Sequence, residues 1–243
     1  MTGIDPLSTA IAERWADLGR RIDSAASANG RDPADVRVVA VTKGFGVEVV
    51  RAARRAGLGR FGESRIQEAE AKILAVPDAE WHLVGHLQSN KARRAVLNFP
   101  WIHAIDSLDL LERVEALAGD EGRQPRVLLQ VNLTGLPTQH GFGVGELGAG
   151  TPGRAALAAS LAALRSASVT GLMGIGPQSL DAIASRAAFA RLRHLRDDLA
   201  DTVGRPLPEL SMGMSADLES AVAEGATLIR VGTGLFGERP GSG

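Results

Sequence analysis

The chain has 243 residues and carries 27 Lys and Arg against 28 Asp and Glu, so its net charge is −1. It contains neither Cys nor Tyr, which excludes disulfides, Cys-ligated metal centres, thiol nucleophiles and phenolic acid–base groups. A charge near zero argues against a surface dedicated to nucleic acid or anionic membrane. No apolar run is long enough to span a bilayer, and the first residues lack the pattern of a signal peptide. We therefore expect a soluble cytoplasmic protein.

The first element along the chain is an amphipathic helix over residues 4–29. Its apolar residues recur at three- or four-residue steps, which is helical spacing; they are Ile4, Leu7, Ile11, Trp15, Leu18 and Ile22. Asn29 and Gly30 are typical of the end of a helix.

The rest of the chain alternates between strand-like and helix-like segments. The expected strands are Val36–Thr42, Arg60–Gly62, Trp81–Val84, Trp101–Ile105, Arg126–Leu133, Val169–Met173, Glu209–Met212 and Leu228–Val231. The expected helices cover residues 46–56, 64–75, 88–97, 107–118, 153–166, 178–203 and 215–224. This alternation predicts an α/β fold with parallel strands. The length suits one (β/α)8 TIM barrel over 1–243 with an extra N-terminal helix, although a doubly wound open sheet also satisfies the count.

The longest loop, Gly135–Pro152, follows the fifth expected strand, where a barrel carries an active-site loop.

Lys43 ends the first strand and is one of only three lysines in the chain, with Lys72 and Lys91. Desolvation at a strand end lowers the pKa of an ammonium group and makes a neutral amine available. Lys43 is therefore a candidate for Schiff-base formation with an aldehyde or ketone, the alternative being a lysine that extends to solvent.

Two glycine-containing turns near the end of the chain predict a phosphate site. Ser211–Asp217 (SMGMSAD) links the seventh strand to a helix expected to begin near Ser215, and Gly213 allows close approach of backbone amides to a ligand. The last strand runs into Gly232–Gly237 (GTGLFG), too near the end of the sequence for a dinucleotide-binding unit. In a barrel these are the loops after strands seven and eight, the usual place for phosphate.

Arg230 lies inside the last strand, on the opposite face from Ile229 and Val231, so that it could face a ligand. The alternative is an ion pair with an acid at a strand end. His82 and His86 do not have the helical spacing of a metal-binding pair, and we expect no metal site.

Several motifs together resemble the YggS/PROSC family of pyridoxal 5′-phosphate (PLP) homeostasis proteins, in the order typical of that family. They are VAVTK ending at Lys43, FGESRIQE over 61–68, WHLVGHLQSNK over 81–91, SMGMSAD over 211–217 and RVGTGLFG over 230–237. The resemblance implies a barrel like the N-terminal domain of alanine racemase, with PLP bound to Lys43 as a Schiff base. It also implies that Ser215, Gly232 and Thr233 hold the phosphate and that Arg230 faces the pyridine nitrogen. The remaining cofactor-binding candidates are Ser64, His82, Met212 and Gly213.

Two departures from the family pattern concern the site. Ser64 stands where the family usually has Asn, and Thr138, Gln139, His140 and Gly141 replace a Ser-Lys-x-Gly pattern in the long loop.

Three functions remain open. The first is a PLP carrier with little or no catalysis, which could pass PLP to PLP-dependent apo-enzymes. The second is a PLP-dependent enzyme with weak racemase-type or other activity on small amino acids, using Lys43 as its sole base. The third is a Schiff-base aldolase for a phosphorylated sugar. Because the chain has no Tyr, racemisation with a tyrosine as the second base is excluded. Arg230 beside the ring nitrogen would weaken PLP as an electron sink. We favour the carrier, as a monomer or weak dimer.

Overall fold

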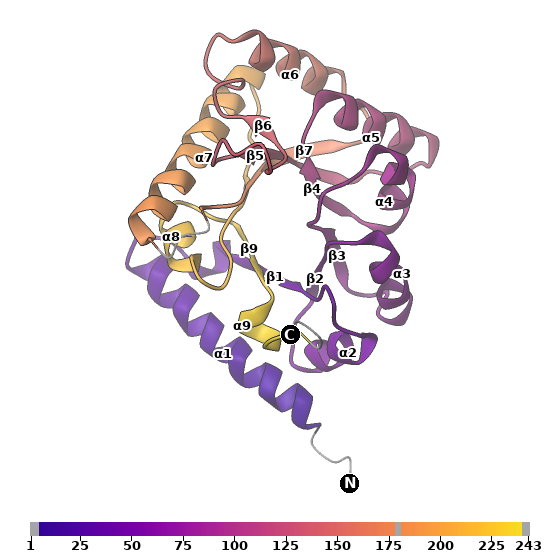
Figure 1. Ribbon diagram of the computed structural model, residues 1–243, viewed down its shortest axis with the longest axis vertical. Coiled ribbons are helices and arrows are strands. Elements are labelled where there is room, and N and C mark those ends of the chain that lie inside the picture. The colour runs from indigo at the N-terminus through magenta and orange to yellow at the C-terminus, as the bar shows by residue number, and fades with distance from the viewer. Residues whose placement is uncertain (1–4, 178–180, 240–243) are drawn as a thin grey trace.

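Eight parallel strands close into a barrel in the computed structural model, which describes residues 5–177 and 181–239 (Figure 1). They are β1 (Arg37–Val41), β2 (Arg60–Glu63), β3 (Glu80–Leu83), β4 (Trp101–Ile105), β5 (Arg126–Asn132), β7 (Ser168–Gly174), β8 (Glu209–Ser211) and β9 (Leu228–Val231). The ring closes because β1 pairs with β9 and β4 pairs with β5. This closure confirms the barrel and rules out the open doubly wound sheet.

Each of these strands begins and ends within one residue of its expected position. The additional strand β6 (Phe142–Gly143) lies inside the long loop and pairs with the end of β5. The loop therefore continues the sheet locally, although its glycine-rich sequence gives no strand signal.

Helices surround the barrel. They are α1 (Pro6–Ser27), α2 (Val47–Arg55), α3 (Ile66–Ala75), α4 (Ala92–Asn98), α5 (Leu108–Asp120), α6 (Pro152–Ala163), α7 (Ala182–Val203), α8 (Leu218–Ala223) and α9 (Thr233–Phe236), with short 3-10 turns at Pro33–Asp35 and Ser89–Lys91. Two of the expected helices begin at residues that lie outside the described part of the chain. These are residues 178–180 of the helix expected at 178–203 and residue 4 of the helix expected at 4–29.

The extra N-terminal helix covers the seam where the barrel closes. Figure 1 shows α1 running along the outside of the ring beside α8 and α9, and α1 also contacts α2. Its buried residues lie on one face, as the apolar spacing predicts; they are Ile11, Leu18, Ile22, Ala25 and Ala26. The helix therefore packs on α2, α8 and α9, the helices that flank the seam between β1 and β9.

The expected helix at 215–224 needs correction, because α8 begins only at Leu218 and Asp217 occupies its N-cap position. Ser215 lies in the preceding turn and is not a helix cap. The reason is that Asp217 accepts a hydrogen bond from the Met214 amide (2.6 Å) and so closes a turn before the helix starts.

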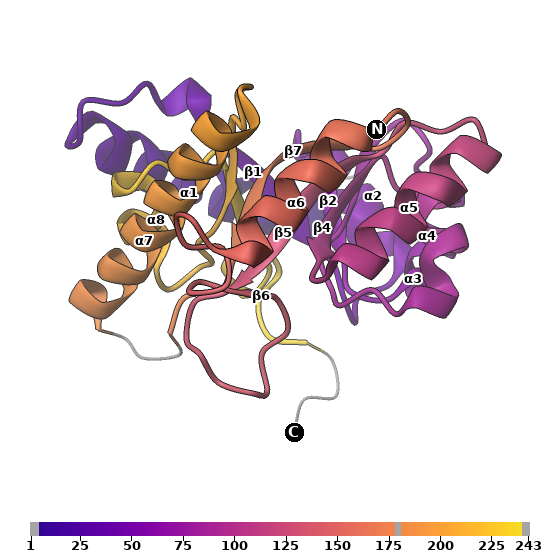
Figure 2. The same cartoon turned by 90° about the horizontal axis from the view of Figure 1, so that it is seen from above.

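The inside of the barrel differs from the layer between strands and helices. The outer layer is a continuous apolar core. The apolar cluster inside the barrel is small and consists, among the described residues, of Val39, Trp101, Ala104, Leu128, Met173 and Leu228. Buried polar side chains, among them His82, His103, Ser211 and Arg230, complete the interior. In Figure 2, the long loop with β6 projects from one end of the barrel. None of the helices in the described part of the chain is both long and apolar enough to cross a membrane.

Candidate functional site

Lys43 follows β1 at the end of the barrel from which the long loop projects. Its side chain is half-buried. Burial is the main cause that lowers the pKa of the Lys43 amine, and the positive charges of Arg239 and Arg65 lower it further, while Glu68 opposes them. The lowered pKa of Lys43 agrees with the expectation from the sequence, because this environment favours the neutral amine.

A buried ion pair fixes the strand ends beneath Lys43. Lys72 donates from Nζ to Oε1 of Glu63 (2.6 Å) and to the carbonyl of Thr42 (2.8 Å). The hydroxyl of Thr42 also donates to Glu63. Burial raises the pKa of Glu63 in spite of these bonds, and its Oε2 has no hydrogen-bond partner among the described residues. Lys72 is therefore committed to structure and is not a free amine.

The two glycine-containing turns meet, as the sequence predicts. The Oγ of Ser215 accepts a hydrogen bond from the amide of Gly234 (3.1 Å), which joins the turn after β8 to the turn after β9. No described residue accepts a hydrogen bond from the N–H groups of Ser215, Ala216 or Thr233. Unpartnered backbone N–H groups gathered in one place suit an anion.

Arg230 points into the barrel. Its Nη1 donates to the Oγ of Ser211 (2.6 Å) and its Nη2 to the carbonyl of Gly174 (3.0 Å). Burial lowers the pKa of Arg230 to about 10, with Asp217 opposing the shift, so the guanidinium stays charged near neutral pH. No ion pair joins Arg230 to a carboxylate within the described residues, so the structural ion pair considered above is not present there.

A chain of hydrogen bonds continues from Ser211 through the barrel interior. Ser211 Oγ lies 2.9 Å from Nδ1 of His103, His103 Nε2 lies 2.9 Å from Nδ1 of His82, and His82 Nε2 lies 3.0 Å from Glu80. Burial lowers the pKa of both histidines, and the hydrogen bond from His82 is the main cause that lowers the pKa of Glu80 to about 2.

The charged ends fix the direction of every bond in this chain. Arg230 can only donate, and the ionised Glu80 can only accept. Ser211 therefore accepts from Arg230 and donates to His103, and each neutral histidine accepts at Nδ1 and donates from Nε2. We refer to Arg230, Ser211, His103, His82 and Glu80 as the interior chain.

A cavity of about 340 Å³ unites most of the predicted residues. Six of the nine candidates line it, namely Lys43, Ser64, Ser215, Arg230, Gly232 and Thr233. Its volume lies within the range of about 300–1,000 Å³ that is usual for small-molecule sites. Lysine, arginine and the unpartnered N–H groups therefore line one space, although they come from opposite ends of the sequence.

The other three candidates do not line this cavity. His82 lies deeper in the barrel and reaches Arg230 only through the interior chain. Met212 is fully buried in the outer apolar core. Gly213 has φ +91°, and a Cβ there would lie 2.4 Å from the Cβ of Ala221, so this glycine permits a close approach of α8. The carbonyl of Gly213 accepts a hydrogen bond from the amide of Arg230 (3.0 Å) and so helps to hold the backbone of Arg230 in place.

Ser64 and Lys43 also line a second cavity, of about 590 Å³. A Cβ at Gly85 would lie 2.3 Å from the Ser64 carbonyl oxygen, so only glycine allows the two segments to pass this closely. His86, His140 and Arg239 line the second cavity as well.

The structure adds residues that are not among the nine candidates. Ser211 and His103 belong to the interior chain, and Arg239 lines both cavities. The strand alternation that places Arg230 inside the barrel could also have placed His103 there. His103 and Ser211 are 108 positions apart in the sequence, so no local sequence pattern predicts their contact.

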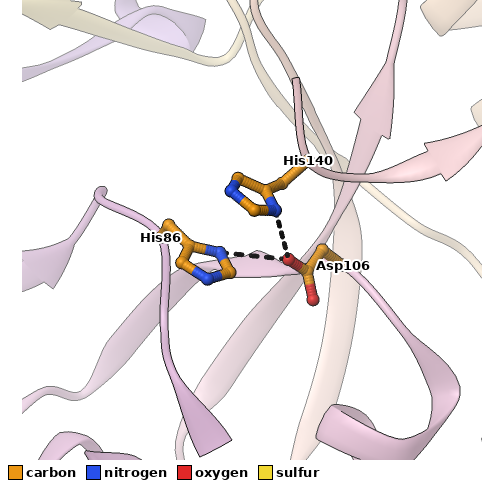
Figure 3. Close-up of side chains that lie close together, drawn as sticks. All are labelled: His86, Asp106 and His140. Atoms are coloured by element: carbon orange, nitrogen blue, oxygen red, sulfur yellow. Dashed lines mark ion pairs between the residues drawn. The ribbon is translucent and has the colours of Figure 1, made fainter. Parts of the chain in front are cut away.

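Figure 3 shows a further cluster at the mouth of the barrel. Nδ1 of His86 lies 3.1 Å from Oδ2 of Asp106, and Nδ1 of His140 lies 3.8 Å from the same oxygen. The two imidazole rings are stacked, with centroids 3.8 Å apart. The structure thus separates His86 from His82, the pair considered in the sequence.

The fold and the cavity define a class of protein: a (β/α)8 barrel with a lysine after its first strand and a glycine-containing turn with an unpartnered backbone N–H group after its last. Comparison with known proteins identifies the class, because residues 17–240 match the family model described as alanine racemase, N-terminal domain. The chain belongs to the family of pyridoxal phosphate homeostasis proteins.

Similar proteins extend over nearly the whole chain. The pyridoxal phosphate homeostasis protein of Pseudomonas aeruginosa is 42% identical over 94% of this chain and 96% of its own length. The one from Escherichia coli K12 is 34% identical over 94% and 97%. The structure of PipY from Synechococcus elongatus with PLP bound has a TM-score of 0.80 and 42% identity, covering 93% of this chain and 100% of that one.

Alanine racemase from Clostridium difficile shares the fold at 14% identity and a TM-score of 0.69. This chain corresponds to 56% of that racemase. At such low identity the likeness concerns the barrel alone.

Proposed function

We propose that this protein binds PLP covalently through Lys43 and acts in intracellular PLP homeostasis, with little or no catalysis. The observation that carries the proposal is the 340 Å³ cavity, which joins an amine of lowered pKa to three unpartnered backbone N–H groups. An aldehyde and a phosphate are the two groups that this pair of features would bind. The PLP-bound structure of the similar protein PipY supports the same assignment.

Each part of the cavity has a separate task. When bound, PLP supplies an aldehyde carbon and an electron-withdrawing ring. Lys43 would provide the amine for the aldehyde, and Ser215, Gly232 and Thr233 would hold the phosphate with backbone N–H and hydroxyl groups. Arg230 remains charged; facing the ring nitrogen, it would disfavour a protonated ring and so limit catalysis.

The remaining candidates fall into two groups. Ser64 lines the cavity, so it would contact the cofactor directly. His82, Met212 and Gly213 act indirectly: His82 through the interior chain, and the other two by supporting the turn after β8.

The test is to add PLP to the purified protein, follow the visible absorption, and reduce with borohydride before peptide mass spectrometry. We expect the label on Lys43 and none on Lys72, which is held in the buried ion pair. Lys43→Ala should abolish the absorption change. Lys91→Ala is the matched control and should keep it. A protein that gains no absorption with PLP, or a label on Lys91, contradicts the proposal.

A second candidate function is a weak PLP-dependent reaction on small amino acids. The 590 Å³ cavity favours it, because this space adjoins Lys43 and carries two further histidines, His86 and His140. Turnover of alanine, serine and threonine distinguishes the two functions. Rapid turnover by the wild type that Lys43→Ala abolishes would favour the enzyme, whereas we expect little turnover.

The biological setting forms part of the proposal. We expect the protein to work in the cytoplasm, as a monomer or weak dimer, and to pass PLP to PLP-dependent apo-enzymes. Mixing the PLP-loaded protein with such an apo-enzyme should restore activity faster than PLP is released into a trap that captures it from solution. Equal rates would show that PLP passes only through solution.

A further inference from the structure

We propose that His86, Asp106 and His140 form a binding site for one divalent transition-metal ion, with Zn²⁺ the best match. The three residues follow β3, β4 and β5 in turn, so that neighbouring strands bring them to one place at the mouth of the barrel (Figure 3). None of the three residues lines the 340 Å³ cavity, although the 590 Å³ cavity beside them includes Lys43.

The distances between the ligand atoms suit an ion. Zn²⁺ binds imidazole nitrogen and carboxylate oxygen at about 2.0–2.2 Å, so that ligand atoms in a tetrahedral site lie about 3.3 Å apart. The oxygen of Asp106 lies 3.1 Å from Nδ1 of His86 and 3.8 Å from Nδ1 of His140. One ligand atom from each residue falls within 4.8 Å of the others.

The donor set selects the class of ion. Two imidazoles and one carboxylate suit Zn²⁺ and neighbouring transition metals, whereas Mg²⁺ and Ca²⁺ prefer oxygen ligands throughout. Three protein ligands leave a position open for water or a small ligand, as in zinc sites of the two-histidine, one-carboxylate type.

The backbone beside each histidine is held in place. The side-chain amide of Gln130 donates to the carbonyl of His140 (2.8 Å), which anchors the long loop to β5. On the other side, Gly85 packs closely against Ser64 just before His86. Both ligands are therefore presented by anchored backbone rather than by free loop ends.

The side chains retain the freedom that coordination requires. The two rings lie within 14° of parallel, so each must turn about its Cβ–Cγ bond to direct Nδ1 at a shared ion. The side chains of His86 and His140 are 40% and 58% exposed, which leaves room for this rotation, while the half-buried Asp106 stays between them.

The open position would face the 590 Å³ cavity, because both histidines line it together with Lys43. The ligand class that completes the coordination is water or a carboxylate of a small molecule in that cavity.

The test uses the full chain without a histidine tag, first treated with a chelator, and measures Zn²⁺ binding by calorimetry and by metal analysis after dialysis. We expect one ion per chain. His86→Ala, Asp106→Asn and His140→Ala should each weaken binding by about tenfold or more. His194→Ala removes an exposed histidine outside the cluster, is the matched control, and should bind as the wild type does.

Co²⁺ gives a second readout, since its visible absorption reports nitrogen coordination and tetrahedral geometry. Lys43→Ala should bind Zn²⁺ and Co²⁺ unchanged, so a failure of PLP binding and a failure of metal binding can be told apart. The proposal is overturned if the wild type binds no Zn²⁺ at micromolar concentration, if His140→Ala retains full affinity, or if His194→Ala loses as much as the cluster variants.

Discussion

Arg230 donates a hydrogen bond from Nη1 to the Oγ of Ser211, 2.6 Å away inside the barrel. No carboxylate pairs with this arginine among the described residues, yet the interior chain links it through two histidines to Glu80. A buried cation is costly unless it is compensated. The charge of Asp217 partly offsets this cost, whereas Glu80 at the far end of the interior chain is itself paired with Arg60 (3.1 Å).

Ser211→Ala should weaken PLP binding about tenfold, equivalent to about 1.4 kcal/mol. The change leaves His103 without a donor and lets Arg230 shift, so the visible absorption of the bound cofactor and its dependence on pH should also change. Ser211→Thr keeps the hydroxyl and should restore both. Ser168→Ala, at the exposed start of β7, is the control. An unaltered spectrum in Ser211→Ala would show that Ser211 does not position Arg230.

Lys72→Met should destabilise the fold by about 3–5 kcal/mol, because it leaves the buried Glu63 without its partner. Chemical denaturation at pH 7 measures the loss. Adding Glu63→Gln should recover part of it, since the carboxylate no longer needs a counter-charge. Lys91→Met serves as the control and should cost less than about 0.5 kcal/mol. Equal costs for both lysine variants would contradict the assigned role of the ion pair.

Stability should fall as the pH drops from about 6.5 to 5. Burial holds the pKa of His103 well below 6.5, and that of His82 below it as well, so the folded state keeps both histidines neutral while the unfolded chain takes up protons. Each such proton costs about 1.4 kcal/mol per pH unit in this window. His103→Gln should flatten the curve of unfolding free energy against pH. A wild-type curve that is already flat between pH 7 and 5 would refute the neutral assignment.

Gly85→Ala should destabilise the protein by about 1–3 kcal/mol and disturb the cavity, because the new Cβ would lie 2.3 Å from the backbone oxygen of Ser64. Gly19→Ala is the matched control: it lies within α1 with no heavy atom near its Cβ position, and alanine there should stabilise by about 0.5–1 kcal/mol. Thermal denaturation and PLP titration of both variants measure the effect. Similar stability in the two variants would contradict the close approach.

The sequence predicts those parts of the site that depend on local pattern. Alternation of apolar strands with helices predicts the barrel, and a lysine directly after an apolar strand predicts its exposure at the strand end. Arg230 faces inward because its neighbours on the strand face outward. The two turns come together because parallel strands end at the same edge of the sheet.

The contacts between distant strands could not be predicted in the same way. The bond between His103 and Ser211 depends on the stagger of β4 against β8 across the barrel, and the stacking of His86 on His140 depends on the course of a glycine-rich loop. The sequence also predicts too early a start for α8. Ser215 and Asp217 are both good capping residues, and the geometry of the turn decides between them.

The pairing of β1 with β9 makes the site a property of the completed ring. Val39 lies beside Arg230 across this seam, so the strand that precedes Lys43 and the strand that precedes the Gly232–Gly237 turn are immediate neighbours. During synthesis the cavity cannot exist until the last strand has emerged and docked. A ligand held from both sides of the seam would stabilise the closed ring by mass action, so the availability of cofactor would set how often the barrel opens at this point.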